Sequence, residues 1–243
     1  ELLFKSLNIP IKIKKTKNID FIELHGQHNF KAFNYNIPGD ISSAAFFIVL
    51  TLLSKKSKIL IKNVNVNESR IGIIKILKKM NCDISVKNKR IYKGEEIADI
   101  IAKSTKNIKA INCPSSLNSS AIDEFLIIFL VAAKAKGIST FKNLDELNKK
   151  ESPRLNIAIK ILNMIGINTL RKKNYLKIYG NPNLNLNKKF IVKNFMKDHR
   201  VFMMSCVAGL VLGGKWTIHD PESANTSFPS FFNIIKRLGA KLD

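Results

Sequence analysis

The sequence predicts an α/β fold made of repeated units, with buried helices and outward-facing mixed sheets. Three observations support this prediction. One layout of helix, strand, polar loop and helix recurs three times, the first helix of each copy is apolar on every side, and short alternating patterns follow the second helix. Such a helix must be buried, and a unit this short cannot bury it alone. The three copies are therefore expected to pack together.

The first half of each unit is an apolar helix followed by a strand. The helices are rich in small residues as well as Phe, Ile and Leu, and are expected at residues 42–54, 121–137 and 198–214. The strands alternate between apolar and polar residues and are expected at residues 58–66, 138–144 and 215–220.

The second half of each unit is an amphipathic helix. These helices end in similar sequences and are expected at residues 70–84, 153–167 and 228–242. Ser152 and Pro153 predict the start of the middle one, with Ser152 as side-chain cap and proline at the first helical position. Each of the first two units is expected to end with one short strand, at residues 83–88 in the first unit and 175–180 in the second.

The composition limits the choice of partner. The 243 residues include 45% hydrophobic residues, enough for one large domain or two smaller ones, and carry a formal net charge of +23. That charge suggests nucleic-acid binding, but only six of the 41 basic residues are arginine and the lysines are spread along the chain. Abundant Lys, Asn and Ile instead indicate an AT-rich genome, and no nucleic-acid partner is expected. A site for small anions remains compatible with the charge.

Cysteine usage and apolar runs give further limits. Cys82, Cys113 and Cys206 are odd in number and far apart, which is typical of a reducing cytosol and gives no metal-binding spacing. The longest uncharged apolar runs have about ten residues, so no membrane span is expected. Because the chain begins at Glu1 inside an amphipathic pattern, we expect it to be a piece of a longer protein.

The repeat also predicts a functional face. Equivalent helix starts should meet at one end of the domain, where acids, cations and helix dipoles converge on a site suited to an anionic substrate and proton transfer. The polar residues at these starts are Ser42, Ser43, Glu68, Arg70, Asp123, Glu124, Lys150, Glu151, Arg154, Asp198, His199, Arg200, Thr226 and Ser227.

Cations are crowded at one of these helix starts. Lys149, Lys150 and Arg154 surround Glu151, although a helix amino end already carries partial positive charge. This arrangement costs stability unless an anion lies among the cations. The alternative interpretation is a solvated, lysine-rich loop.

Five motifs in order resemble a known family. They read IPGDISSAAFF from residue 37, IDE from residue 122, DELNKKESPR from residue 145, DHR from residue 198 and TSFPSF from residue 226. Together they resemble 5-enolpyruvylshikimate-3-phosphate synthase (3-phosphoshikimate 1-carboxyvinyltransferase) over essentially the whole chain. The resemblance implies the enolpyruvyl-transferase fold, with residues 1–37 ending an N-terminal domain and crossing over, and residues 38–243 forming the C-terminal domain.

The resemblance also implies a reaction. Such enzymes transfer the enolpyruvyl group of phosphoenolpyruvate to the 5-hydroxyl of shikimate 3-phosphate and release phosphate, in the shikimate pathway of aromatic amino-acid and chorismate biosynthesis. No metal or organic cofactor is implied. We expect a cytoplasmic protein that is a monomer when full length.

Roles for individual residues follow from the same resemblance. Asp123 is expected to accept the proton of the shikimate hydroxyl, and Glu151 to take part in proton transfer to the methylene. Lys150 is expected on the shikimate 3-phosphate side. Arg154 and Arg200 are expected to clamp phosphoenolpyruvate, because guanidinium groups match carboxylate and phosphate oxygens. Two further candidates are His199, which could orient the site, and Thr226, where many relatives have a phosphate-binding lysine.

Three positions depart from the family pattern, and three alternatives stay open. Asn148, Lys149 and Pro153 stand where the family usually has arginine, valine and aspartate. The alternatives are the enolpyruvyl transferase acting on UDP-N-acetylglucosamine, a basic nucleic-acid-binding module of the same architecture, and a fragment without activity of its own.

Overall fold

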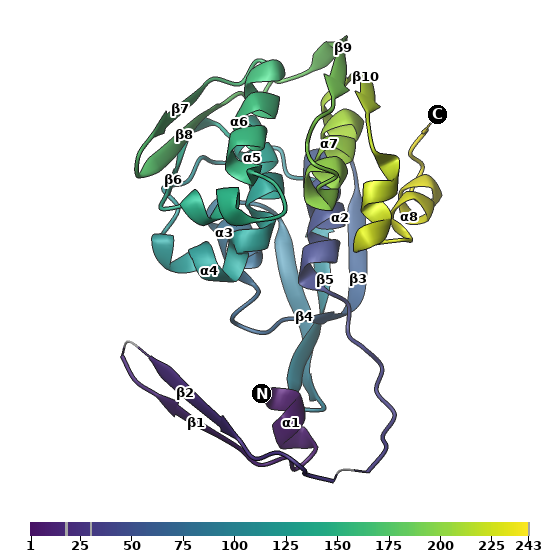
Figure 1. Ribbon diagram of the computed structural model, residues 1–243. Coiled ribbons are helices and arrows are strands. Elements are labelled where there is room, and N and C mark those ends of the chain that lie inside the picture. The colour runs from purple at the N-terminus through teal and green to yellow at the C-terminus, as the bar shows by residue number, and fades with distance from the viewer. Residues whose placement is uncertain (18, 30, 243) are drawn as a thin grey trace.

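Three apolar helices form the centre of the protein. The structure is a computed structural model and describes residues 1–17, 19–29 and 31–242. Helices α2 (Ile41–Leu53), α5 (Phe125–Lys134) and α7 (His199–Leu212) pack against one another, and strands and amphipathic helices surround them (Figure 1). Almost every residue of α5 is buried, as expected for a helix that is apolar all round. The predicted α/β architecture with buried helices is confirmed.

The first two sheets share one topology. The first unit pairs its strands in the order β3-β5-β4 and the second in the order β6-β8-β7, all antiparallel. Their bounds are Lys58–Asn65 for β3, Ile84–Tyr92 for β4, Glu95–Lys103 for β5, Gly137–Lys142 for β6, Thr169–Lys172 for β7 and Tyr175–Gly180 for β8. Gly39 bridges β3 in parallel, Asn112 bridges β6 in parallel, and Lys109 bridges Lys136 just before β6, so both sheets are mixed, as predicted.

The third unit contains one parallel strand pair among the described residues. Strand β9 (Leu186–Val192) pairs with β10 (Gly213–Ile218), and α7 lies between the two strands in the sequence. In the repeat, β9 corresponds to the parallel edge segments at Gly39 and at residues 109–112. All three units therefore start with an edge segment that lies parallel to the strand after the apolar helix.

The predicted order of elements was wrong in one respect. Two strands, not one, follow the second helix in each of the first two units, so residues 83–88 and 175–180 are not equivalent: the former begin β4 and the latter are β8. The β4–β5 turn at Lys93 and Gly94 has positive φ at both residues, +49° and +84°, as in a two-residue hairpin turn. Their sequence, with lysine before the glycine, is a weaker hairpin signal than Asn-Gly.

Each unit contains one amphipathic helix. These are α3 (Gly72–Lys79), α6 (Arg154–Met164) and α8 (Phe231–Arg237), and each follows a polar loop. Aromatic rings attach α8 to α2, with the ring centroid of Phe47 5.7 Å from that of Phe228 and 5.9 Å from that of Phe231. Short helical turns precede several helices: η1 (Ser115–Leu117), α4 (Asn118–Ala121), η2 (Ile122–Glu124), η3 (Asp145–Lys149) and η4 (Pro221–Thr226).

The stretch from η1 to α5 is also relevant to the membrane prediction. Residues Ser115–Lys134 form a continuous helical stretch that is long and apolar enough to span a bilayer. However, 61% of its most apolar window is buried inside the protein, which is typical of a core helix.

The described residues among the first 37 lie at one end of the three units and touch them at the β4–β5 turn, where a β-carbon on Gly94 would lie 2.7 Å from the Leu2 carbonyl oxygen. Helix α1 (Leu2–Ser6) and the antiparallel hairpin of β1 (Ile11–Lys15) and β2 (Asp20–Leu24) stand below the main body, and an extended segment leads from them to α2 (Figure 1). Where this segment passes the β4–β5 hairpin, the ring of Tyr35 stacks on that of Tyr92 at 5.4 Å, and the Asn36 N–H donates to the Tyr92 hydroxyl at 3.0 Å.

A double irregularity in the first sheet accompanies this contact. Strands β3 and β4 both shift register opposite Asp99 of β5, where Asn63 and Asn88 have positive φ. The Asp99 carboxylate accepts from the Asn63 N–H at 3.0 Å and the Asn88 amide at 2.8 Å. Paired bulges increase strand twist, and beyond them the hairpin continues to Tyr92.

The three cysteines are buried, one in each unit. Cys82 follows α3, Cys113 lies in the edge segment of the second sheet, and Cys206 is in α7. Burial raises the pKa of Cys82 and Cys206 to about 12 and that of Cys113 to about 11. These thiols are therefore protonated and unreactive in the folded protein at neutral pH.

Gly72 allows the first and second units to approach closely. A β-carbon on Gly72 would lie 2.6 Å from the carbonyl carbon of Ser120, closer than packed atoms can be. This contact lies two residues after Arg70 and three before Asp123. We predict that Gly72→Ala lowers the free energy of unfolding by about 2 kcal/mol despite the better helix propensity of alanine. Urea denaturation of the 243-residue chain measures this.

Gly26 provides the matched control for that measurement. It has open space where a β-carbon would be, and its φ is not positive. Gly26→Ala should leave stability nearly unchanged. Equal stability of the two variants would contradict the proposed close approach.

Candidate active site

The predicted meeting of helix starts is present in the structure. The side chain of Ser42 at the start of α2 donates to Glu124, which directly precedes α5. Arg200, in the first turn of α7, donates from NH1 to the backbone carbonyl of Asp123 at 3.1 Å. These contacts join one helix from each unit, so the amino ends of the three central helices lie together. Their dipoles add positive potential to this end of the protein.

Asp123 is the centre of the cluster. Four cationic groups lie near its carboxylate: Lys150 Nζ at 3.5 Å, Arg154 NH1 at 3.6 Å, Arg200 NH2 at 3.7 Å and Arg70 NH2 at 3.8 Å. Its side chain is 21% exposed, so solvent and solutes can reach it. All four separations are longer than the usual length of a charge-assisted hydrogen bond, about 2.7–2.9 Å.

The pKa of Asp123 reflects these neighbours. Burial would raise it, but Arg200, then Lys150, Arg70 and Arg154, outweigh burial and lower it below its ordinary value. Asp123 is therefore a carboxylate at neutral pH.

Arg154 is buried to a greater extent than the sequence suggested. Only 1% of its side chain is exposed, and its Nε donates to Asp198 at 2.8 Å, with NH2 3.4 Å from the second Asp198 oxygen. Its NH2 is also 2.6 Å from Glu151, which is 56% exposed. Arg154 thus holds two carboxylates, one inside the protein and one at the surface.

Asp198 connects the second and third units. One oxygen accepts from Arg154 and from the Ser152 hydroxyl at 2.8 Å, while the other accepts from the backbone N–H of Arg200 at 2.9 Å and caps α7. Burial would raise the pKa of Asp198, but the Arg154 hydrogen bond and charge, with Ser152 and the Arg200 N–H, lower it.

The prediction that Ser152 caps α6 was wrong, because its hydroxyl donates to Asp198. Pro153 also precedes the helix, which begins at Arg154. Instead, the side-chain oxygen of Asn148 accepts from the N–H of Asn156 at 3.2 Å. The asparagine that replaces the family's usual arginine therefore stabilises this helix start.

His199, Thr226 and Glu68 were also predicted on this face, and each has different surroundings. His199 is partly buried beside Arg200, and burial followed by the Arg200 charge lowers its pKa, so it is neutral at pH 7. Thr226 is exposed at the end of η4. Glu68, which the sequence placed on the same face, instead pairs with Lys75.

Two residues of the predicted face have roles that the sequence did not indicate. Arg70 reaches from the first unit to donate to the Ser42 hydroxyl at 3.0 Å, and it approaches Asp123. Glu124 points inward with 2% exposure, accepting from Ser42 and lying 3.7 Å from Arg200 NH1. Burial raises the pKa of Glu124, although Ser42 and Arg200 oppose this. The scarcity of arginine was a usable signal, since three of six arginines meet here.

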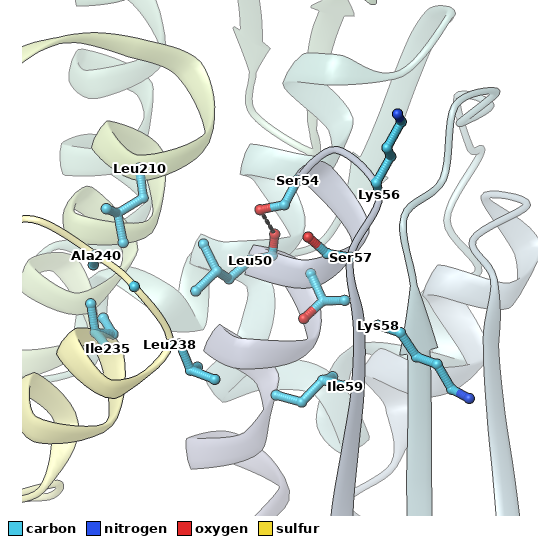
Figure 2. Close-up of a pocket in the computed structure, with 12 residues that line it drawn as sticks. Leu50, Ser54, Lys56, Ser57, Lys58, Ile59, Leu210, Ile235, Leu238 and Ala240 are labelled. Carbon is cyan, nitrogen blue, oxygen red and sulfur yellow. Dashed lines mark hydrogen bonds between the residues drawn. The ribbon is translucent and has the colours of Figure 1, made fainter.

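A surface cavity elsewhere is not part of this cluster. A hollow of about 440 Å³ lies between the carboxyl end of α2, the start of β3 and α8, with Leu50, Leu210 and Ile235 along one side (Figure 2). Ser54 in its wall donates to the carbonyl of Leu50 in the same helix. Residues 42 and 54 are about 18 Å apart along α2, so the cavity and the cluster lie at opposite ends of that helix. Of these two places, the amino end of α2 is the one where charged groups of both signs converge, which makes that end the candidate site.

Within the described ranges, His, Cys, Asp and Glu form no group of three that could hold a metal ion. In the cluster, guanidinium and ammonium groups supply the positive charge.

Comparison with solved structures defines the class of protein. The enolpyruvyl transferase NikO from Streptomyces tendae superposes with a TM-score of 0.67 at 15% identity, covering 96% of this chain and 51% of NikO. An EPSP synthase from Acinetobacter baumannii superposes with a TM-score of 0.87 at 33% identity, covering 97% of this chain and 53% of that one. The fold is thus that of the enolpyruvyl transferases, as predicted.

Sequence comparison identifies the family. The profile for EPSP synthase (3-phosphoshikimate 1-carboxyvinyltransferase) matches residues 1–235. A 3-phosphoshikimate 1-carboxyvinyltransferase from Zymomonas mobilis is 36% identical over 245 residues, covering 100% of this chain and 54% of the relative. A 3-phosphoshikimate 1-carboxyvinyltransferase from Petrotoga mobilis is 35% identical over 210 residues, covering 86% of this chain and 48% of the relative. The chain belongs to the EPSP synthase family, and it spans about half the length of these curated relatives.

The buried pair of Arg154 and Asp198 gives a stability prediction. Asp198→Asn leaves the Arg154 charge buried with weaker compensation, so we expect a loss of about 3 kcal/mol in the free energy of unfolding at pH 7. Because the folded-state pKa of Asp198 is lowered, its stabilisation is complete above about pH 4 and is lost as pH falls through the folded-state pKa. Urea denaturation of chain and variant at several pH values measures this.

The control for Asp198→Asn is Asp145→Asn. Asp145 pairs with Arg171 at 3.4 Å, but the Asp145 side chain is 64% exposed. Loss of its charge should therefore have no measurable effect on the free energy of unfolding. If the difference in free energy of unfolding between the unchanged chain and Asp198→Asn stayed constant into strong acid, this would contradict the assignment of Asp198 as a carboxylate.

Proposed function

We propose that the chain forms the C-terminal domain of an enzyme that transfers the enolpyruvyl group of phosphoenolpyruvate to the 5-hydroxyl of shikimate 3-phosphate. Residues 1–37 would end the N-terminal domain and cross over, and residues 38–243 would form the C-terminal domain. The observation that carries the proposal is the partly exposed Asp123 carboxylate among Lys150, Arg154, Arg200 and Arg70. A carboxylate ringed by cations is suited to deprotonate a hydroxyl between two bound anions.

Asp123 is proposed as the proton acceptor. The hydroxyl oxygen adds to the central carbon of phosphoenolpyruvate, its proton passes to Asp123, and the methylene carbon gains a proton. The tetrahedral intermediate then loses a methyl proton and phosphate. With no ligand bound, the four cations make Asp123 a weak base. Phosphate and carboxylate groups that engage those cations would raise its basicity at the moment it is needed.

The cations have different proposed tasks. Arg200 is 14% exposed and only loosely paired, so its NH2 can bind phosphoenolpyruvate directly. Lys150 is 26% exposed and lies 3.5 Å from Asp123, and it would contact shikimate 3-phosphate. Arg154 can clamp phosphoenolpyruvate only by exchanging Glu151 for the incoming carboxylate. That exchange would free the exposed Glu151 carboxylate to take up a proton from solvent and pass it to the methylene carbon.

His199 and Thr226 are given supporting tasks. A neutral His199 beside Arg200 could orient the site without adding charge. Thr226 is at the exposed end of η4, where a phosphate could approach it. Neither residue is required for the proposed proton transfers.

The wider biological setting is part of the same proposal. The enzyme would act in the shikimate pathway of aromatic amino-acid biosynthesis, as a cytoplasmic monomer with small anionic substrates rather than nucleic acid or membrane as partners.

Phosphate release tests the reaction directly. The complete gene product that contains this chain should release phosphate from phosphoenolpyruvate when shikimate 3-phosphate is added, and not when UDP-N-acetylglucosamine is added. The 243-residue chain alone, tested in parallel, measures what this part contributes. Phosphate release with only the nucleotide sugar would contradict the proposed acceptor.

Arg200→Lys should weaken both binding and chemistry. Lysine keeps the charge but loses the forked donors, and charge shifts onto phosphate as it departs, so we expect a loss of about 2 kcal/mol of transition-state stabilisation. Steady-state kinetics of the complete gene product should give lower kcat and higher KM for phosphoenolpyruvate. As a contrast, Asp123→Asn should lower kcat with little change in that KM. Unchanged kinetics for Arg200→Lys would rule out the anion-clamp role.

Activity should not depend on a divalent ion. Guanidinium and ammonium groups supply the positive charge at the proposed site, so incubation with EDTA should leave phosphate release unchanged. Loss of activity with EDTA and its return with a divalent cation would contradict this prediction.

A further inference from the structure

Glu124 is a buried carboxylate that takes no part in the proposed proton transfers. Its side chain is 2% exposed, although the adjacent Asp123 is 21% exposed. The two residues lie in the short turn η2, where Asp123 faces outward and Glu124 faces the helix junction. Burying a carboxylate is costly unless it is paired, so the partners of Glu124 indicate its purpose.

The partners of Glu124 come from the other two units. The Ser42 hydroxyl donates to its Oε1, and that hydroxyl in turn accepts from Arg70 at 3.0 Å. Arg200 NH1 lies 3.7 Å from the same Oε1. A line of contacts therefore runs from Arg70 through Ser42 and Glu124 to Arg200.

Arg200 is oriented by this arrangement. Its NH1 edge is held by the Asp123 carbonyl at 3.1 Å and by the Glu124 charge. The NH2 edge lies 3.7 Å from the exposed Asp123 carboxylate. One edge of the guanidinium is thus fixed inside the protein and the other is presented to the site.

We infer that Glu124 is a positioning residue that holds Arg200 in the orientation needed to bind phosphoenolpyruvate. This inference rests on the proposed function. Without the Glu124 charge, the guanidinium keeps only one carbonyl acceptor on its inner edge and can turn towards Asp123. The effect should fall on phosphoenolpyruvate and leave shikimate 3-phosphate, on the Lys150 side, unaffected.

A purely structural role would give a different result. If Glu124 only fastens α2 to α5 through Ser42, its replacement would lower stability and affect both substrates alike. A positioning role acts through Arg200, so it must disappear when the Arg200 fork is absent. This difference allows the two roles to be separated by kinetics.

The test is a double-mutant cycle in the complete gene product. Glu124→Gln keeps the size of the side chain and an acceptor for Ser42 but removes the charge. We expect KM for phosphoenolpyruvate to rise about tenfold, with KM for shikimate 3-phosphate unchanged. In the Arg200→Lys background, Glu124→Gln should cause no further rise. Glu96→Gln, which removes a carboxylate paired with Lys89 at 2.9 Å in the outer sheet, is the control and should behave as the unchanged protein.

The outcomes separate this inference from the proposed function. Absence of turnover in the unchanged protein would overturn both. Normal turnover with an equal rise of KM for both substrates, or an additive effect in the Arg200→Lys background, would overturn the positioning role alone.

Ser42→Ala is the second variant, in case Glu124→Gln fails to fold. It removes the hydroxyl from Glu124 and should raise KM for phosphoenolpyruvate about threefold, again only when Arg200 is present. A KM for phosphoenolpyruvate unchanged in Ser42→Ala would overturn the inference.

Discussion

The ion pair between Arg154 and Asp198 is the interaction on which the rest of the candidate site depends. Both side chains are almost completely buried, at the place where α6 of the second unit meets α7 of the third. Because one Asp198 oxygen also caps α7, the pair sets where that helix begins and hence where Arg200 projects. Removing either partner would leave the other charge in the interior with weaker compensation, which destabilises the place where the two helices meet.

The threefold repeat explains why this site needs so few special residues. Each unit delivers the amino end of one apolar helix to the same place, and each contributes a cation to the surroundings of Asp123: Arg70 from the first, Lys150 and Arg154 from the second and Arg200 from the third. The carboxylates Asp123, Glu124, Glu151 and Asp198 balance these charges. The cations of the empty site are therefore balanced within the protein, and an anion would have to replace internal partners in order to bind.

Much of this arrangement could be predicted from the sequence, and the exceptions at the site have one physical cause. Periodicity and the repeat identified all six main helices and the face where they begin, because both are local patterns. The capping of α6 could not be predicted, because Ser152 can donate either within its own chain segment or to Asp198, and only tertiary packing decides. The opposite orientations of Asp123 and Glu124 are equally invisible in sequence, since both are acids at one helix start.

The burial of one thiol in each unit has a practical consequence. A protonated, enclosed cysteine reacts with an alkylating reagent only when its surroundings open. The alkylation rates of Cys82, Cys113 and Cys206 therefore report how often each repeat opens. If the repeats open independently, the three positions will be alkylated at different rates, whereas a single shared rate means that the fold opens as a whole. The three native cysteines thus allow the cooperativity of unfolding to be measured without introducing a label.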